Sequence, residues 1–278
     1  MTVINTNINA IDATNASNSA AKLLSTAMQQ LSTGTRINSA ADDAAGLAIS
    51  NSMTSQINGM QQGIRNANDG ISLAQTGEGA LTEVTNMLQT IRNLAVQSSS
   101  GTYSATDRTN MQSEVTSLST EINNIITGTQ FNGNNVFSTS GTDATFNIQA
   151  GANTSDAVTL TSTSMSDLAS GNLVGASTNL LVDTTAHAAT TITNVESALS
   201  QVNATNAGLG AGENELSSAV NNLTSGSTNL TAARSRIKDT DYSLASTQLS
   251  KAQILSQAST AMIAQANQSA QNVLTLLK

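Results

Sequence analysis

Apolar residues recur every three or four positions along most of the chain, and no proline interrupts them. This spacing places apolar side chains on one face of an α-helix and is typical of helices that pack side by side. Proline removes a backbone donor and breaks a helix, so its absence lets long helices run uninterrupted. The pattern predicts long packed helices rather than a compact globule.

Three stretches carry the pattern through the first half of the chain. Near the N-terminus its apolar residues are Ala13, Ala16, Ala20, Leu24, Ala27 and Leu31. A second stripe runs over 53–95 and a third over 111–125. Ser104 and Asp107 precede the third stripe at the spacing of a capping box, in which the two side chains satisfy backbone N–H groups of the first turn. We therefore expect a helix to begin directly after Ser104.

Two further stretches carry the pattern to the C-terminus. One covers 192–237, and the last has its stripe at Leu255, Ser259, Met262, Ala266, Val273 and Leu277. Both end stripes are rich in alanine, whose burial removes little apolar surface at about 25 cal/mol per Å². We expect the helices over 13–31 and 255–277 to be too weak to hold together as an isolated pair. They should order when they bundle with each other and with neighbouring copies.

The middle of the chain changes period. Residues 145–150 and 158–161 alternate between apolar and polar side chains, and the turn residues Gly151, Ala152, Asn153 and Thr154 separate them. Alternation of period two is the pattern of strands, so we expect a β-hairpin at about 144–162. Residues 163–190 are rich in Ser, Thr and Gly and are predicted to form a short variable loop.

The predicted fold is mainly α: a long antiparallel helical bundle or coiled coil with both termini at one end and a small distal β-hairpin. We expect two domains. Residues 1–42 and 237–278 form a terminal helical domain, and residues 43–236 form a second helical domain that includes the hairpin and the short loop.

The charge distribution argues against several classes of partner. The formal net charge is −8, which makes nucleic acid an unsuitable partner. No Lys or Arg occurs over 109–233, where nine acidic residues lie. The apolar run over 44–49 is too short to span a bilayer. The N-terminus has no positive charge before Lys22 and no apolar run of signal length, so we expect retention in the cytoplasm or export without a cleaved signal.

The residue types needed for catalysis or metal binding are scarce. The chain has no cysteine and a single histidine, His187, which we interpret as a surface residue. Asp42, Asp43, Asp239 and Asp241 are interpreted as helix caps or partners of Arg36, Arg234, Arg236 and Lys238 rather than as a metal site. No nucleophile elbow, P-loop or metalloprotease motif is present. The chain is therefore not expected to be an enzyme or to need a cofactor.

Two glycine-rich segments resemble fragments of phosphate-binding loops. They are Gly77-Glu78-Gly79 and Gly208-Leu209-Gly210-Ala211-Gly212. Neither follows a predicted strand or completes a nucleotide-binding fingerprint. We interpret these glycines as sites of close helix packing or local flexibility.

Long blocks at both ends of the chain resemble bacterial flagellins. In the N-terminal half they are Leu31-Ser32-Thr33-Gly34-Thr35-Arg36-Ile37-Asn38-Ser39-Ala40-Ala41-Asp42-Asp43-Ala44-Ala45-Gly46, Arg65-Asn66-Ala67-Asn68-Asp69-Gly70-Ile71-Ser72 and Thr129-Gln130-Phe131-Asn132-Gly133. In the C-terminal part they are Ala233-Arg234-Ser235-Arg236-Ile237-Lys238-Asp239-Thr240-Asp241-Tyr242 and Ala264-Gln265-Ala266-Asn267-Gln268-Ser269-Ala270-Gln271-Asn272-Val273-Leu274. The resemblance covers roughly 1–165 and 190–278 in order.

This resemblance implies a subunit of the flagellar filament that is exported unfolded by a type III apparatus and polymerises outside the cell for motility. The terminal domain would line the inner tube of a helical homopolymer, and residues 43–236 would form the outer tube. The implied partners are other copies of the chain, an export chaperone, a cap and hook-junction proteins, with no nucleic acid or membrane. The short segment between hairpin and return helix implies a short form with little or no variable outer domain.

The resemblance also assigns site residues. Leu24, Ala27, Leu31, Leu255, Met262, Ala266, Val273 and Leu277 would be assembly-helix residues. Gln89, Arg92, Leu94 and Glu114 would form a lateral contact between subunits that resembles the patch read by the flagellin-sensing Toll-like receptor. Thr90 stands where strongly stimulatory flagellins carry arginine, and the loss of that planar multi-donor group predicts weakened receptor activation.

Two other classes of function compete with a filament subunit. A hook–filament junction protein would share the helical plan but assemble in few copies. An enzyme with a site in the middle of the chain would need chemistry-bearing residues that the sequence does not supply.

Overall fold

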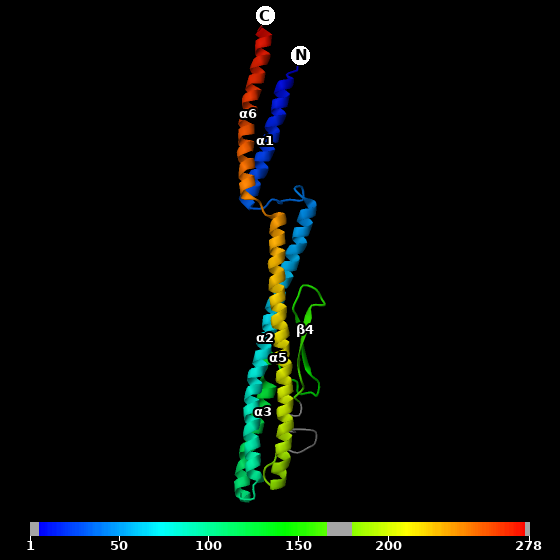
Figure 1. Cartoon of the computed structure of the whole chain (residues 1–278), viewed down its shortest axis with the longest axis vertical. Coiled ribbons are helices and arrows are strands. Elements are labelled where there is room, and N and C mark those ends of the chain that lie inside the picture. Colours follow the sequence, from blue (N-terminus) through cyan, green and yellow to red (C-terminus); the bar gives the residue numbers. More distant parts are fainter. Residues whose placement is uncertain (1–5, 166–179, 276–278) are drawn as a thin grey trace. The chain divides into compact units, whose positions relative to one another are not determined.

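The computed structural model describes residues 6–165 and 180–275, and it is mainly helical, as the sequence predicts (Figure 1). Five helices occur in these ranges: α1 (Ile8–Thr33), α2 (Ala44–Ser99), α3 (Ala105–Gly128), α5 (Thr185–Lys238) and α6 (Tyr242–Thr275). The strands are β1 (Gln130–Phe131), β2 (Asn134–Asn135), β3 (Ala144–Gln149) and β4 (Ala157–Ser162). No helix in the described ranges is long and apolar enough to cross a membrane.

The chain divides into two compact units. The terminal unit comprises residues 1–55 and 228–278, and the central unit comprises residues 56–227. The helices α2 and α5 each contribute residues to both units.

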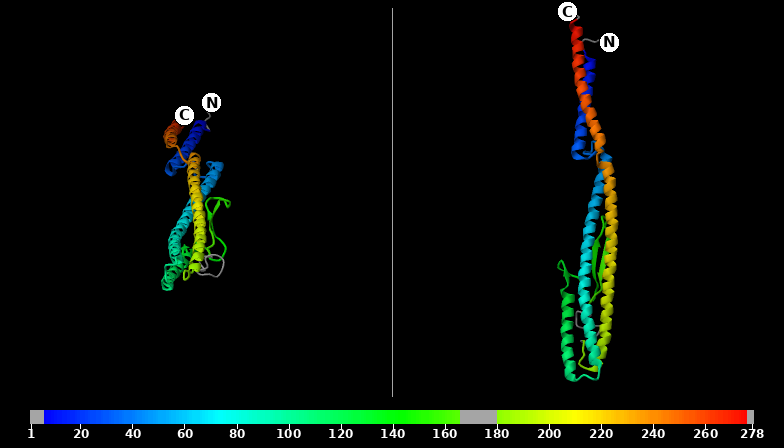
Figure 2. Two further views of the ribbon diagram at one scale, coloured as in Figure 1. Left: turned by 60° about the horizontal axis from the view of Figure 1, so that its bottom comes forward. Right: turned by 60° about the vertical axis from the view of Figure 1, so that its left-hand side comes forward.

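In the terminal unit, α1 and α6 pack against each other as an antiparallel pair (Figure 2). The Asn7 side chain donates from Nδ2 to the carbonyl oxygen of Ala266 at 3.0 Å, which brings the start of α1 beside the C-terminal part of α6. The predicted pairing of the two terminal segments is therefore confirmed. Fully buried residues at the pair's interface are small ones, including Ala20, Ala27 and Ala252.

A short connection in the terminal unit follows α1. Gly34 ends the helix with a φ of 70°, a left-handed conformation that glycine adopts without steric cost. Thr35 then forms an isolated antiparallel bridge with Asp239. The guanidinium of Arg36 donates from Nη2 to the carbonyl oxygen of Ile237 at 2.7 Å. These contacts hold the segment after α1 against the end of α5.

The four aspartates of the predicted capping clusters satisfy backbone and side-chain donors. Asp43 accepts from the N–H of Gly46 at the start of α2, and Asp241 accepts from the N–H groups of Ser243 and Leu244 at the start of α6. Asp42 and Asp239 accept hydrogen bonds within their own turns. Helix capping is therefore confirmed for Asp43 and Asp241 but not for Asp42 and Asp239, and among the described residues no ion pair joins any of the four to a basic side chain.

The central unit has its core where α2, α3 and α5 face one another. Each helix contributes residues that are fully shielded from solvent, such as Leu88 of α2, Val115 of α3 and Val202 of α5. The predicted start of α3 is confirmed, because Ser104 is its N-cap and forms a reciprocal capping box with Asp107. This cap satisfies two of the backbone donors that a helix start leaves free.

The predicted β-hairpin is confirmed. β3 pairs antiparallel with β4, with Phe146 opposite Leu160 and Ile148 opposite Val158. Leu160 is fully buried, and the hairpin lies against α2 at glycines where a side chain would collide with it. A Cβ on Gly63 would come within 2.9 Å of the backbone of Ala150.

The glycine-rich segments of α2 and α5 divide into crowded and open positions. A Cβ on Gly77 would meet Leu209 at 2.9 Å, and one on Gly212 would collide with the side chain of Leu160. Gly79 has no neighbour within 4 Å. The interpretation of close packing is therefore right for Gly77 and Gly212 but does not explain Gly79.

The segment predicted as a loop over 163–190 is only partly described. Its residues 166–179 lie outside the described ranges, and α5 already begins at Thr185. Met165 and Val182 are buried in the core rather than exposed. The side chain of Gln112 on α3 accepts from the N–H of Val182 at 2.6 Å, which shows how a polar segment is tied to the helices.

Candidate assembly surfaces

The interface between α1 and α6 follows a seven-residue repeat. Apart from Gln30 near its end, the buried and half-buried residues of α1 are Ala10, Ala13, Ser17, Ala20, Leu24, Ala27 and Leu31. On α6 they are Ala245, Leu249, Ala252, Ser256, Ser259, Ile263, Ala266 and Ala270. Alternating steps of three and four are the a and d positions of a coiled coil. The interface is built largely from small side chains, which let the two backbones approach closely.

The structure places the predicted assembly residues in two different environments. Ala27 is buried, and Leu24, Leu31 and Ala266 are half-buried at the α1–α6 interface. Leu255 and Met262 are 40% and 61% exposed. The side chain of Val273 and all of Leu277 lie outside the described part of the structure.

The exposure of Leu255 and Met262 results from the register of α6. Of the stripe proposed from the sequence, the structure buries Ser259 and half-buries Ala266 but leaves the larger Leu255 and Met262 outside, and it buries Ala252 instead. Leu255 and Met262 are each three residues beyond a buried position and fall on the flank of the repeat. On α6 a row of small residues runs beside a row of large residues. Both rows have the helical period, so the sequence gives little indication of which row is buried.

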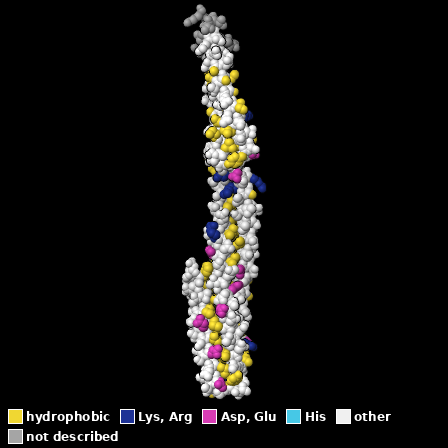
Figure 3. All heavy atoms as spheres, turned by 90° about the vertical axis from the view of Figure 1, so that its left-hand side faces the viewer, with side chains coloured by type: hydrophobic (Ala, Val, Ile, Leu, Met, Phe, Trp, Pro, Cys, Tyr) yellow, Lys and Arg dark blue, Asp and Glu magenta, His cyan; other side chains and the backbone are white. Residues whose placement is uncertain are grey.

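A groove runs beside the interface on the flank that Leu255 and Met262 occupy. It has a volume of about 410 Å³, and α1 contributes Ala13 and Ala16 to its lining. Hydrophobic side chains gather over the terminal helices in the space-filling view (Figure 3). This exposed apolar surface is the kind of feature that marks an interaction site.

The predicted lateral patch lies in the central unit. Gln89 is exposed on α2, and Arg92, one turn further on, pairs with Glu196 of α5 through Nη2 and Oε1 at 3.0 Å. Leu94 is half-buried and packs against the helical core. Glu114 is exposed on α3, and among the described residues no hydrogen bond or ion pair connects it to Gln89 or Arg92. The structure therefore brings Arg92 to Glu196, a partner that the sequence did not indicate.

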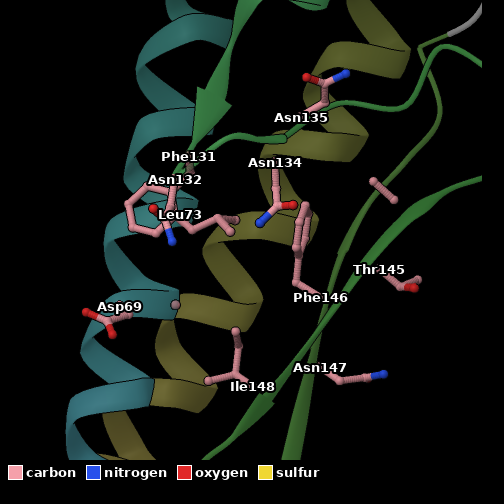
Figure 4. A pocket seen from close by; sticks show the side chains of 12 residues that line it. Asp69, Leu73, Phe131, Asn132, Asn134, Asn135, Thr145, Phe146, Asn147 and Ile148 are labelled. Carbon is pink, nitrogen blue, oxygen red and sulfur yellow. The ribbon is translucent and has the colours of Figure 1, made fainter.

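Another groove lies in the central unit and was not expected from the sequence (Figure 4). It has a volume of about 850 Å³, and its lining includes Asp69, Leu73, Phe131, Asn134 and Phe146. These residues come from α2, the β1–β2 hairpin and β3, so only the tertiary fold assembles them. The turn residues Asn132 and Gly133 have positive φ values of 50° and 81°, and the Asn-Gly-Asn sequence is the one local signal of the turn.

Three carboxyl groups are held ionised by local hydrogen bonds. The Ser104 hydroxyl and backbone N–H lower the pKa of Asp107, and the backbone N–H groups of Ser39 and Asn38 lower the pKa of Asp42. A hydrogen bond from His187, at 2.6 Å, lowers the pKa of Asp183. His187 is at the surface, as predicted. All three carboxylates stabilise turns or helix starts, which is a structural role.

Comparison with known proteins gives a consistent result for both halves of the chain. The model of the bacterial flagellin N-terminal helical region matches residues 4–142, and the model of the C-terminal helical region matches residues 192–277. Flagellin B of Vibrio cholerae is 47% identical over 162 residues, which is 58% of this chain and 43% of that protein. Flagellin C of the same species is 45% identical over 176 residues, 63% of this chain and 45% of that protein. The chain thus matches less than half the length of these relatives.

Solved structures share the fold. The crystal structure of Bacillus cereus flagellin has a TM-score of 0.51 and 34% identity, covering 61% of this chain and 94% of that one. A putative flagellar hook-associated protein from Vibrio parahaemolyticus has a TM-score of 0.59 at 13% identity, covering 71% and 100%, and this likeness concerns the fold alone. On the two family-model matches, this chain belongs to the bacterial flagellin family.

Proposed function

We propose that this chain is a structural subunit that polymerises into the bacterial flagellar filament. The carrying observation is the mismatch at the terminal helix pair, where small residues fill the shared interface while Leu255 and Met262 stay exposed. Burying an alanine contributes far less than the roughly 1.5–3 kcal/mol of a fully buried large apolar side chain. Neighbouring copies that cover the exposed side chains supply the missing apolar burial.

Electrostatics contributes little to this pairing. Over Ile8–Thr33 and Tyr242–Thr275 the charged residues are Asp12, Lys22 and Lys251. Exposed ion pairs are in any case worth about 0–1 kcal/mol. The assembly of the terminal helices therefore depends on apolar contact and on hydrogen bonds from Asn, Gln, Ser and Thr side chains.

The two parts of the chain would occupy different radii in such a filament. Residues 1–42 and 237–278 would form the inner tube, and residues 43–236 the outer tube. The bridge between Thr35 and Asp239 supports this division, because it pairs the two chain segments close to both proposed boundaries. The two compact units have their boundaries at 55 and 228, so the terminal unit also includes the first turns of α2 and the last turns of α5, which are joined by a hydrogen bond from Arg234 to Thr54.

The lateral contact in the outer tube would use Gln89, Arg92, Leu94 and Glu114. Gln89 and Glu114 are exposed, and Arg92 keeps 43% of its side chain accessible beside Glu196. The same surface would engage the flagellin-sensing Toll-like receptor only weakly. Thr90 uses its hydroxyl to donate to the carbonyl oxygen of Asn86 at 3.0 Å and offers no guanidinium.

Family membership supports the remaining partners of the proposal. The subunit would leave the cell through type III export with a dedicated chaperone. It would then add beneath a cap protein to a filament that starts from hook-junction proteins.

The proposed polymerisation is tested with Leu255→Asp and Ala266→Asp. An aspartate at either position would bring an uncompensated charge into apolar contact, so both variants should fail to form filaments in electron micrographs. The control is Gln268→Asp, which adds the same charge at an exposed polar position of α6 and should still polymerise. Far-UV circular dichroism should show the central unit still folded in all three. Normal filaments from both Leu255→Asp and Ala266→Asp would contradict the terminal-helix mechanism.

A hook–filament junction protein is the alternative function. The structural likeness to the hook-associated protein shows the fold alone and does not favour it. The two functions differ in the extent of assembly. A filament subunit elongates indefinitely when purified chain is added to short seeds, whereas a junction protein stops after a few copies.

A further inference from the structure

The chain contains two Asn-Gly pairs, and the structure places them in different backbone environments. Asn58-Gly59 lies in the interior of α2, whereas Asn132-Gly133 forms the whole loop between β1 and β2. Both asparagine side chains are exposed to solvent. A difference in chemical reactivity between the two pairs therefore has to come from the backbone, because the local sequence and the access to water are alike.

Asparagine is a chemically labile residue, and a following glycine favours the loss of its side-chain amide. In this reaction the backbone nitrogen of the glycine gives up its proton and attacks Cγ of the asparagine. The new N–Cγ bond closes a five-membered succinimide ring and the Cγ–Nδ2 bond breaks. Ammonia leaves with the proton that the backbone nitrogen lost, which solvent carries across. Glycine has no Cβ to hinder the attack.

Water then opens the ring at one of its two carbonyl carbons. Attack at Cγ breaks the new bond and leaves an ordinary aspartate. Attack at the backbone carbonyl carbon leaves isoaspartate, in which the main chain runs through Cβ and Cγ and so gains one atom. Both products carry one negative charge more than asparagine, and the whole reaction consumes water and releases ammonia without an oxidant or a cofactor.

The β1–β2 turn leaves the reacting groups free. Phe131 pairs with Asn134, so Asn132 and Gly133 form a two-residue loop, and their φ values of 50° and 81° are those of a type I′ turn. Within the described ranges no hydrogen bond engages the Asn132 side chain or the N–H of Gly133. A Cβ on Gly133 would meet no atom within 4 Å. Rotation of the turn towards ring closure therefore breaks no hydrogen bond of these two groups.

The same reaction is obstructed at Asn58. Gly59 lies inside α2 (Ala44–Ser99), so its N–H donates to the carbonyl four residues earlier. Ring closure would have to break helix hydrogen bonds far from either end of α2. Gly59 also packs against the β3–β4 hairpin, where a Cβ would come within 2.7 Å of the Ala152 side chain. Asn58 can therefore react only in molecules in which this part of α2 has opened.

We propose that Asn132 is a site of spontaneous deamidation in the folded chain and that the helix protects Asn58. The inference concerns the chemistry of the single chain, so it does not depend on the proposed polymerisation.

Isoaspartate at position 132 should loosen the β1–β2 hairpin. The type I′ turn joins the two strands with two residues, and an additional main-chain atom does not fit this geometry. Val136 and Phe137 follow β2 directly and are buried in the core, so the hairpin sets where the chain enters the core. Figure 4 shows Asn132 beside Phe131 in the lining of the 850 Å³ groove, so the new charge would also enter that groove.

Mass spectrometry of the natural chain tests the inference without a substitution. Folded protein is incubated at mildly alkaline pH, and timed samples are digested after acidic residues, because no Lys or Arg occurs over 109–233. The fragments 44–69 and 122–143 then contain Asn58 and Asn132. Tandem spectra locate the modified residue, and chromatography separates aspartate from isoaspartate. We expect amide loss at Asn132 to be at least about tenfold faster than at Asn58, because helix opening limits the reaction at Asn58.

The same incubation in concentrated urea is the matched control, since it removes the fold and keeps both local sequences. Asn58 and Asn132 should then react at comparable rates. Equal rates at the two sites in the folded chain would overturn the inference, as would amide loss at Asn132 only after unfolding. An unchanged ratio in urea would also overturn it, because the difference would then come from the sequence.

The variant Asn132→Asp separates the effect of the charge from that of the additional main-chain atom. It carries the same charge as isoaspartate but keeps the normal backbone. The isoaspartate form, purified after incubation, should unfold at a lower urea concentration than both the natural chain and Asn132→Asp. An isoaspartate form as stable as Asn132→Asp would contradict the expected loosening of the hairpin.

Discussion

Asn7 donates a hydrogen bond from Nδ2 to the carbonyl oxygen of Ala266 at 3.0 Å, although 259 positions separate the two residues in the chain. The same side chain accepts from the N–H of Ala10 at 3.1 Å and so caps α1. One residue thus starts a helix and attaches it to its antiparallel partner. Asn is suited to both tasks because its amide carries an acceptor and two donors.

Substitutions at Asn7 should separate these two tasks. Asn7→Asp keeps a capping oxygen but loses the donor to Ala266, whereas Asn7→Ala loses both and should cost the helix start about 1 kcal/mol. In assembled filaments, hydrogen exchange at the first turn of α1 should therefore be slowest in the natural chain, faster in Asn7→Asp and fastest in Asn7→Ala. Natural-like exchange in Asn7→Asp would show that the bond to Ala266 adds nothing.

Two glycines of α2 should respond in opposite directions to the same substitution. Gly63→Ala forces a methyl group to within 2.9 Å of hairpin backbone and should lower the unfolding free energy of the central unit by about 1–3 kcal/mol. Gly79→Ala meets no atom within 4 Å and should raise it by up to about 1 kcal/mol, because alanine favours helix. Urea denaturation followed by circular dichroism measures both. A loss of stability in Gly79→Ala would contradict the packing described here.

The capping box of α3 should make the central unit sensitive to acid. The pKa of Asp107 is lowered by hydrogen bonds from Ser104, so the folded state binds the proton more weakly than the unfolded state. The contribution is present above the unfolded pKa of about 4 and is lost as the pH falls through the lower folded value. Urea midpoints between pH 5 and pH 2 should fall less steeply in Asp107→Asn than in the natural chain. Glu114→Gln on the same helix is the control and should keep the natural slope.

Assembly should change which bonds a protease can reach. Trypsin sites in the terminal helix pair are Lys22 in α1 and Lys251 in α6, and both residues are exposed. Because the α1–α6 interface is poor in large side chains, we expect rapid cleavage of the unassembled chain that trims it to roughly 40–240. Filaments should resist this cleavage, and Arg92 in the central unit should survive in both states. Mass spectrometry of timed digests measures the rates, and equal trimming in both states would contradict assembly-coupled ordering.

Elongation should become more favourable as salt is added. The central unit contains thirteen acidic and three basic residues, so laterally packed copies repel each other. Raising ionic strength to about 0.1 M shortens the screening length to about 10 Å and weakens this repulsion. The critical concentration should therefore fall between about 10 mM and 100 mM sodium chloride. Replacing the exposed Glu83 and Glu215 with Gln should reduce this dependence, and an unchanged dependence would point to a different origin of the salt effect.

Much of the fold could be predicted from local chemistry. The three-and-four spacing of apolar residues predicted the helices, Ser104 and Asp107 predicted the start of α3, and alternation over 145–161 predicted the hairpin. Each of these signals depends on residues that are close together in the chain, so it can be interpreted without knowing which distant segments pack against it. The start of α5 was placed too late, because Thr184 caps a helix whose first turns are polar.

Tertiary packing determined which face of each helix is buried against its neighbouring helix. The amino-acid sequence alone determined that both ends form helices with an alanine-rich repeat. It did not determine that α6 buries Ala252 beside Ser259 while Leu255 and Met262 stay outside, although all four positions are compatible with a helical stripe. Both registers satisfy the helical period, and the choice is made by the close approach that small side chains allow between two backbones. The groove containing Phe131 and Phe146 likewise depends on segments that only the folded chain brings together.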